Sequence, residues 1–572
     1  MRTGTRFLFG VALSLAAASL LPATSRRADA PKFFDDDPLT REPETQDASG
    51  VKEWNIHLVW DLAENTFGRP GDSAPDVRAR NINSVDEVPD SNWFTNRIGA
   101  KPLSIEEAVK GPINGNGPAA GTWTVTRGKQ AGFAPGFTIR DSEGETWFVS
   151  FDAEGFPEAA TGAILVANRI FWSLGYWQVE NHLIQVKRDQ LQVSEEATIT
   201  PPSGHKRRMK LRDLDDVFRR SHRGPDGTYR AIAARALPGR VLGGFRYYGT
   251  RPDDPNDVVP HEHRRELRAL KVFGAWTNLV DMKAGNTLDS LITENGKGVV
   301  RHYLQDVGST FGTGALAPRE YDEGWEHLYE GDLVWKRLVT LNFYMKPWQT
   351  VPYEKSPAIG RFEGNEFDPT TWKPRVPTAA FLRSRPDDEF WAARRVMAFS
   401  DDMIRHLAAT GRYSDEAAAV HLADVLINRR DKIGRAYLNA VNPVVDIKLD
   451  SSGTLTFENA AVAAGVASEA SQYQVSFAAF DNATGESTPL GPPLTTTDRR
   501  VRLPQELSSR TPTFVMVRIA ATSPDHPAWA MPVDAYFRRS SGGGWKLVGL
   551  ERLPRNHADR IQRTQQTSTR DQ

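Results

Sequence analysis

Residues 281–306 read DMKAGNTLDSLITENGKGVVRHYLQD, and this stretch decides the fold that we predict for the chain. Apolar residues at helical spacing over 261–280 predict a helix that delivers Asp281 into a loop. Segments 287–293 and 298–305 flank an Asn-Gly pair, which is the strongest short signal for a β-hairpin. The hairpin folds the chain back, so we expect Asp306 to return beside Asn286.

The side chains gathered by this hairpin suit one kind of chemistry. Asn286 and Asp306 offer hard oxygen ligands of the kind that Mg²⁺ prefers, so we predict them as metal ligands. Asp281 is placed to orient or deprotonate a hydroxyl group, and Lys283 is placed to steady a transferring phosphoryl group. We predict Asp281 and Lys283 as catalytic residues, because phosphoryl transfer depends mostly on positioning and charge stabilisation.

The chain before this stretch changes its pattern at Gly121. Periodicity predicts three strands, a helix and a fourth strand, in the order 123–127, 137–140, 147–151, 157–174 and 182–186. A polar, Arg-rich insertion is expected over 196–250. Residues 323–440 carry long helical patterns. The order is therefore β-β-β-α-β, followed by a region that is mainly helical.

These motifs resemble those of the protein kinase-like superfamily, in particular its HipA-like, phosphoinositide-kinase-like and secretory-pathway branches. Asp281-x-x-x-x-Asn286 resembles the catalytic loop, and Asp306-Val307-Gly308 resembles the metal-binding D-F-G motif with Val in place of Phe. The resemblance implies an α+β fold with a two-lobed kinase-like core. Its small lobe with the insertion would span 121–255, and its mainly helical large lobe would span 256–441. The resemblance also implies Mg²⁺ and ATP as cofactors.

The small lobe departs from the kinase pattern at one position. A kinase carries a Lys on its third strand for the nucleotide phosphates, and Ser150 stands there instead. The loop over the phosphates supplies the predicted cofactor-binding residues Gly128, Lys129 and Gly132, with Lys129 replacing the missing lysine as in the "with-no-lysine" kinases. Glu158 is the predicted acid partner, although an acid at a helix start also stabilises the helix dipole. The alternative is a pseudokinase that binds nucleotide weakly or not at all.

The outer regions have patterns of their own. Residues 31–120 are rich in Asp, Asn, Pro and Gly and predict an extended arm. Its aromatic residues are expected to anchor it on the next domain, namely Trp54, Trp60, Trp93 and Phe94. Seven short segments of period two within 442–553 predict an all-β sandwich that resembles a fibronectin type III module. Residues 554–572 are polar and basic and predict a disordered tail.

The N-terminus predicts export. Arg2 and Arg6 precede an apolar run over 7–21, and Ala28-Asp29-Ala30 fits a small-x-small cleavage site, so 1–30 is predicted to be a signal peptide. The run is shorter than the roughly 20 residues of a spanning helix, and an uncleaved anchor is the alternative. We expect a periplasmic or secreted mature chain without a transmembrane segment.

Composition narrows the function further. The absence of cysteine excludes disulfides, thiolate metal sites and a Cys nucleophile. A net charge of −1 argues against nucleic-acid binding. The predicted function is transfer of the γ-phosphoryl group of ATP to a hydroxyl of an unknown acceptor, which is a protein, a sugar or a lipid headgroup. Two alternatives stay open: a non-catalytic pseudokinase or scaffold that binds cell-envelope components, and a carbohydrate-active envelope hydrolase, which only the 15 Trp residues favour.

Overall fold

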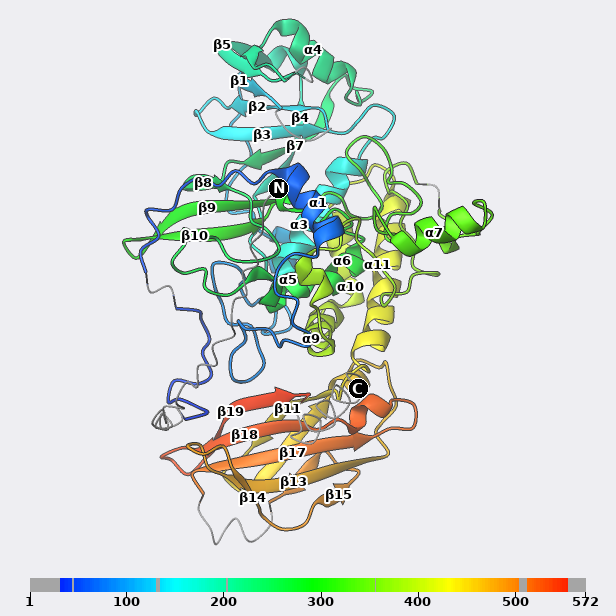
Figure 1. Cartoon of the computed structure of the whole chain (residues 1–572). Helices are drawn as coiled ribbons and strands as arrows, with labels where there is room; N and C mark the ends of the chain where they lie inside the picture. Colours follow the sequence, from blue (N-terminus) through cyan, green and yellow to red (C-terminus); the bar gives the residue numbers. More distant parts are fainter. Residues whose placement is uncertain are drawn as a thin grey trace, which may run out of the picture.

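The computed structural model describes residues 31–43, 46–129, 134–201, 204–354, 356–503 and 512–553. In these ranges the chain is a mixed α+β protein with several sheets, which confirms the α+β part of the predicted fold (Figure 1). No helix there combines the length and the apolar character needed to cross a membrane. The predicted signal peptide over 1–30, the predicted tail over 554–572 and Gly132 lie outside the described residues.

Seven strands of the described chain form one sheet, in the order β4-β7-β3-β2-β1-β5-β6. They are β1 (Trp123–Gly128), β2 (Gly136–Arg140), β3 (Thr146–Phe151), β4 (Asn181–Val186), β5 (Leu191–Ile199), β6 (Arg207–Arg208) and β7 (Tyr229–Arg235). Helix α3 (Ala159–Leu174) runs between β3 and β4, and α4 (Leu211–Arg219) follows β6. The predicted β-β-β-α-β order is thus confirmed.

The polar insertion predicted over 196–250 is wrong in part, because much of it belongs to sheets. Strand β7 lies between β3 and β4 and pairs antiparallel with both. Its sequence contains three Ala residues, and Ala has a low β-propensity, so the local pattern does not indicate a strand. Burial of Ala231, Ile232 and Ala233 between two neighbouring strands decides the structure instead.

A second sheet has the order β10-β9-β8 within the described ranges. It consists of β8 (Arg240–Gly243), β9 (Thr287–Glu294) and β10 (Lys297–Leu304). The predicted hairpin is confirmed, since Lys297 pairs with Glu294 and Leu304 pairs with Thr287. Asn295 and Gly296 have φ values of 50° and 77°, the left-handed angles that a tight Asn-Gly turn requires.

The helix predicted over 261–280 is broken into η3 (His261–His263), α5 (Arg265–Arg268) and α6 (Leu270–Thr277). Charged residues of this segment point inward rather than to solvent. Arg265 and Arg268 are fully buried and donate hydrogen bonds of 2.8 and 3.0 Å to the carboxylate of Asp388. Asp388 belongs to α9 (Pro386–Met397), so buried ion pairs join α5 to α9.

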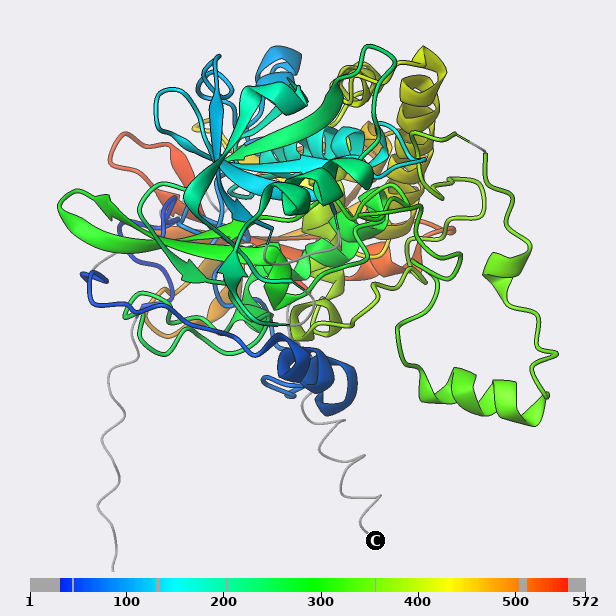
Figure 2. The same cartoon turned by 90° about the horizontal axis from the view of Figure 1, so that it is seen from above.

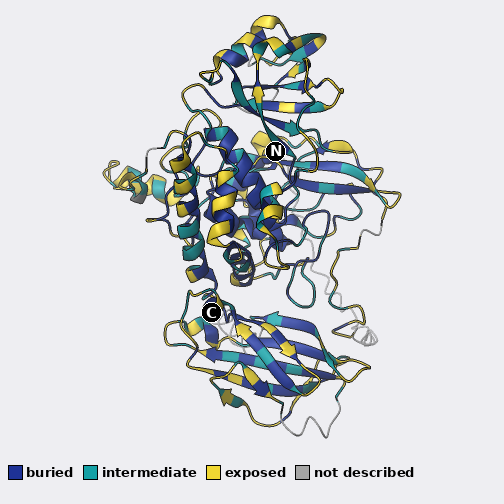
Figure 3. Cartoon of the chain, turned by 180° about the vertical axis from the view of Figure 1, so that it is seen from behind, coloured by how far each residue is buried: buried dark blue, intermediate teal, exposed yellow. Residues whose placement is uncertain are grey.

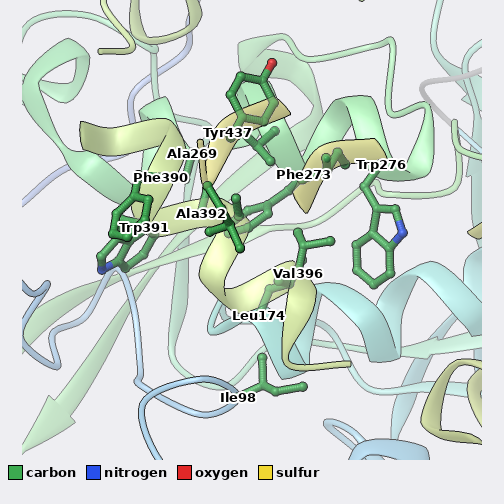
Figure 4. Close-up of a cluster of buried hydrophobic side chains, with 14 of the residues drawn as sticks. Ile98, Leu174, Ala269, Phe273, Trp276, Phe390, Trp391, Ala392, Val396 and Tyr437 are labelled. Atoms are coloured by element: carbon green, nitrogen blue, oxygen red, sulfur yellow. The ribbon is translucent and has the colours of Figure 1, made fainter. Parts of the chain in front are cut away.

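The region beyond the hairpin is mainly helical over 379–437, as predicted, whereas its described residues between 307 and 378 are mostly irregular. Its helices are α7 (Gly331–Val339), α8 (Ala379–Leu382), α9 (Pro386–Met397), α10 (Asp401–Ala409) and α11 (Glu416–Tyr437). Phe273 and Trp276 of α6 share one buried cluster with Trp391 and Val396 of α9 (Figure 4). Ile98 of the N-terminal arm joins the same cluster, so the arm contributes to this core.

The N-terminal arm contains α1 (Leu58–Ala63), the π-helical turn η1 (Glu64–Gly68) and α2 (Ile105–Lys110). The predicted anchors Trp93 and Phe94 are confirmed, since both are buried. The prediction for Trp60 is wrong, because its side chain is 61% exposed on the outer face of α1. An aromatic residue in a polar arm therefore does not always mark a buried contact.

The C-terminal region forms two sheets in the described part of the chain, β11-β12-β16 and β14-β13-β17-β18-β19 with β15 beside β13. All seven predicted segments are strands, and the short β14 and β15 add to them. The bounds are β11 (Val444–Leu449), β12 (Thr454–Asn459), β13 (Gln472–Phe480), β14 (Ser487–Pro489), β15 (Leu494–Thr496), β16 (Arg500–Arg502), β17 (Phe514–Thr522), β18 (Val533–Arg539) and β19 (Trp545–Arg552). The arm contacts this region where Leu550 N donates to Ser84 O.

Candidate functional site

The open end of the β9–β10 hairpin brings the predicted metal ligands together. The short turn η4 (Ala284–Asn286) precedes β9, and the backbone N–H groups of Gln305 and Asp306 both donate to the carbonyl oxygen of Asn286 at 3.1 Å. The predicted return of Asp306 to Asn286 is therefore confirmed. These bonds fix the spacing of the two residues through the backbone, whatever their side chains bind.

Asp281 lies at the same end and is held by cations. Lys283 Nζ donates to its Oδ2 at 2.8 Å, and Arg319 Nη2 lies 3.8 Å from the same oxygen. Asn286 Nδ2 donates to the Asp281 backbone carbonyl at 2.7 Å, which braces the loop. Burial raises the pKa of Asp281, but the charge of Lys283 outweighs it, so the pKa lies below its usual range. Asp281 is ionised at neutral pH.

Asn286 and Asp306 suit a magnesium ion that also binds a ligand. Asp306 is exposed, and the hydrogen bond that its carboxylate accepts from the described residues comes from Gly308 N at 3.3 Å. The Asn286 amide nitrogen is used by Asp281, which leaves its oxygen for a metal. No three His, Asp or Glu side chains of the described residues gather as a metal site. Mg²⁺ commonly binds one or two protein oxygens and completes its coordination shell with phosphates and water. Asn286 and Asp306 can supply two such oxygens.

Lys129 approaches the site from the seven-stranded sheet. It follows β1 directly, and its Nζ donates to Ser150 Oγ on β3 at 3.4 Å. Burial lowers the pKa of Lys129, while the negative charge of Asp306 raises it in part. Lys129 therefore lies within the electrostatic influence of Asp306. A lysine thus stands at the side chain of Ser150, the position where the kinase pattern expects one.

Two predicted cofactor-binding residues have other contacts. Gly128 is the last residue of β1, and a Cβ there would lie 2.8 Å from the side chain of Ile199, so close packing against β5 requires glycine. Glu158 accepts hydrogen bonds from Ser414 N at 2.8 Å and Ser414 Oγ at 3.1 Å. Its other carboxylate oxygen lies 3.9 Å from Arg230. Glu158 thus ties the start of α3 to the segment before α11, and it makes no described contact with Lys129.

Sequence reasoning missed Arg319, which connects three parts of the site. Its guanidinium donates to Ser309 Oγ at 2.5 Å and lies 3.8 Å from both Asp281 and Glu323. Burial raises the pKa of Glu323, and the charge of Arg319 lowers it in part. Arg319 sits in no motif, so only the folded chain reveals it.

Comparison of the chain with protein-family models, with curated proteins and with solved structures found no match. The chemistry of the site therefore follows from its own groups. These are an ionised carboxylate on Asp281, oxygen ligands on Asn286 and Asp306, and cations on Lys129, Lys283 and Arg319.

Proposed function

We propose that the chain is an exported kinase-like protein with a two-lobed core, which binds ATP with Mg²⁺ between the seven-stranded sheet and the β9–β10 hairpin. The observation that carries this proposal is the close grouping of Asp281, Lys283, Asn286 and Asp306 at the open end of the hairpin. Lys129 Nζ lies 3.4 Å from Ser150 Oγ, and the negative charge of Asp306 partly raises the pKa of this lysine. A lysine and a metal-type carboxylate that influence each other's charge suit a nucleoside triphosphate.

The remaining residues suit transfer of the γ-phosphoryl group. The bond between the γ-phosphorus and its bridging oxygen breaks, the acceptor oxygen bonds to phosphorus, and ADP leaves. Asp281, kept ionised beside Lys283, takes the proton of the acceptor hydroxyl. Lys283 and Arg319 stabilise the charge of the moving group, since both lie beside Asp281. Mg²⁺ on Asn286 and Asp306 would neutralise phosphate charge.

A non-catalytic, nucleotide-binding scaffold is the second candidate, and one observation favours it. In protein kinases the phosphate-binding Lys pairs with a Glu of the neighbouring helix. Helix α3 contains no Asp or Glu in its sequence, and Glu158 at its start is bound to Ser414. Lys129 is therefore not paired in that way. If the protein is a scaffold, its C-terminal sheets form a fibronectin type III-like sandwich that binds a partner in the cell envelope.

The two candidates differ in one measurement, the rate of ADP formation from Mg²⁺-ATP by the wild type and by Asp281→Asn. A general base contributes about 10²- to 10⁴-fold, so the variant should lose at least about 100-fold. Asp402→Asn, a change of the same kind on the exposed face of α10, should keep the full rate. If all three proteins bind nucleotide but form ADP at the same low rate, the result would support the non-catalytic scaffold. Absence of both binding and turnover would refute the nucleotide site.

A further inference from the structure

Helix α7 and the residues after it stand away from the body of the protein on long connections (Figure 2). None of the described side chains of α7 is buried, in contrast to the helices of the core (Figure 3). The segment nevertheless contains many large apolar residues. The exposed ones are Val334, Trp335, Leu338, Val339, Leu341, Phe343 and Met345. Leu341 and Phe343 are the extreme cases, with 79% and 84% of their surface exposed.

One face of the helix, which carries the charged side chain of Arg337, lies toward the protein. Leu333 and Arg337 are four residues apart and therefore share one face, and both are partly buried. Arg337 forms an ion pair with Glu326, and Trp348 Nε1 donates to the same carboxylate at 2.7 Å. The apolar stripe consequently faces solvent, which is the reverse of an ordinary surface helix. A contiguous exposed apolar patch of this kind marks an interaction site.

The charge and aromatic content of the segment select its partner. Residues 331–346 contain three basic residues and one acidic residue, a local charge of +2, whereas the whole chain carries −1. Lys346 lies 4.8 Å from the ring of Trp348, and Lys336 lies 5.7 Å from the ring of Tyr344. Basic residues and aromatic rings bordering an apolar stripe are typical of segments that lie in the interface of an anionic bilayer.

A second exposed apolar element projects from the same side of the molecule. Figure 2 shows α1 and η1 on the side from which α7 projects. The ring of Phe67 in η1 packs 5.1 Å from that of Tyr329, just before α7. Phe67 and Val59 are 68% and 72% exposed. Two apolar projections on one side suit a flat partner better than a groove.

We infer that residues 331–346, together with Val59 and Phe67, form a docking face for the surface of an anionic lipid bilayer. Leu341 and Phe343 enter the acyl boundary, while Lys336 and Lys346 meet the headgroups. The inference uses none of the residues of the nucleotide site, so it stands independently of phosphoryl transfer.

Flotation of the mature protein with lipid vesicles tests this face. The protein should float with vesicles in which about a third of the lipid is phosphatidylglycerol and less with phosphatidylcholine alone. The double variant Leu341→Asp/Phe343→Asp should bind at least about tenfold more weakly. Lys336→Glu/Lys346→Glu should remove the preference for anionic vesicles. Val420→Asp, at a 54% exposed site on α11, is the matched control and should float like the wild type.

Three results would overturn the inference. The first is a wild-type protein that floats with neither kind of vesicle, and the second is a Leu341→Asp/Phe343→Asp variant that floats as well as Val420→Asp. The third is a wild-type dimer in size-exclusion chromatography with light scattering that the Leu341→Asp/Phe343→Asp variant converts to a monomer, since a second copy would then cover the face. All altered residues are largely exposed or only partly buried, so unchanged melting temperatures verify folding.

Discussion

The ammonium group of Lys129 lies 3.4 Å from the hydroxyl oxygen of Ser150, on a strand that pairs with the one after the Lys129 loop. Gly136, at the start of β2, pairs with Ser150, and a Cβ at Gly136 would lie 2.3 Å from the Val149 carbonyl oxygen. The close approach of β2 and β3 therefore requires glycine opposite Ser150. Lys129, directly after β1, occupies the space beside a strand position that lacks a lysine.

A lysine at position 150 on β3 should partly replace Lys129 in nucleotide binding. Lys129→Met should weaken ATP binding about 10- to 100-fold, because a hydrogen bond to a charged group contributes roughly 1.5–3 kcal/mol. The double variant Lys129→Met/Ser150→Lys should recover at least part of that affinity, as measured by titration calorimetry.

Lys448→Met is the matched control for this series, since Lys448 lies on the exposed side of β11. It should bind ATP like the wild type. Full affinity in Lys129→Met would show that Lys129 does not contact the nucleotide.

Lys283→Met should shift the acid limb of the pH–rate profile. Lys283 Nζ lies 2.8 Å from Asp281 and keeps the pKa of that carboxyl below its usual range, against the effect of burial. Without this charge the pKa rises, so Asp281 is protonated at higher pH and activity falls earlier on acidification. An acid limb at the same pH in both proteins would contradict the role of Asp281 as base.

The hairpin and the first three strands were predictable from sequence because local signals specify them. Asn295-Gly296 adopts left-handed angles that few other residue pairs accept, and this turn alone fixes the register that returns Asp306 to Asn286. The alternation in β1 and β3 reflects one buried face and one face that is partly exposed. For these elements, the nearby residues carry the information.

The rest of the site depends on contacts between distant residues. Glu158 was expected to face a lysine, but Ser414, 256 residues later in the chain, binds it. Arg319 reaches Asp281 only because the segment after the hairpin folds back over it. Strand β7 is fixed by pairing with β3 and β4 on either side. The sequence patterns within these segments do not indicate which distant residues they will contact.

Phe94→Ala should destabilise the protein by about 3–5 kcal/mol, the usual effect of removing a buried aromatic side chain. Phe94 is completely buried, and its ring lies 5.6 Å from Trp391 of α9 and 6.0 Å from Tyr176. Trp60→Ala removes a larger ring from the same arm, but Trp60 is 61% exposed and should change stability little. Denaturant unfolding measures both. Equal effects would mean that the arm does not share the core.

Acidification should remove the contribution of Glu87 to the free energy of unfolding. Burial raises the pKa of Glu87, but Arg394 and Arg395 outweigh it and lower the pKa to about 2. Because an unfolded Glu titrates near 4.3, the ionised side chain stabilises the fold above that pH and loses this effect as pH falls toward 2. Glu87→Gln should therefore cost about 2 kcal/mol at pH 7 and progressively less below pH of about 4.

Unfolding of Glu87→Gln and wild type at a series of pH values measures this difference. Glu106→Gln, an exposed position on α2, is the control and should follow the wild type throughout. A difference for Glu87→Gln that stays constant from neutral to acidic pH would show that its charge is not what links the arm to α9.

A thermal shift with Mg²⁺ and ATP tests most directly whether Lys129, Asn286 and Asp306 form one nucleotide site. ATP at ten times its Kd should stabilise the protein by about 1.4 kcal/mol. The rise in melting temperature should require Mg²⁺, vanish in Asp306→Ala and persist in Asp498→Ala, an exposed control far along the chain. No rise with any nucleotide at millimolar concentration, or an equal rise in Asp306→Ala, would contradict the proposed site.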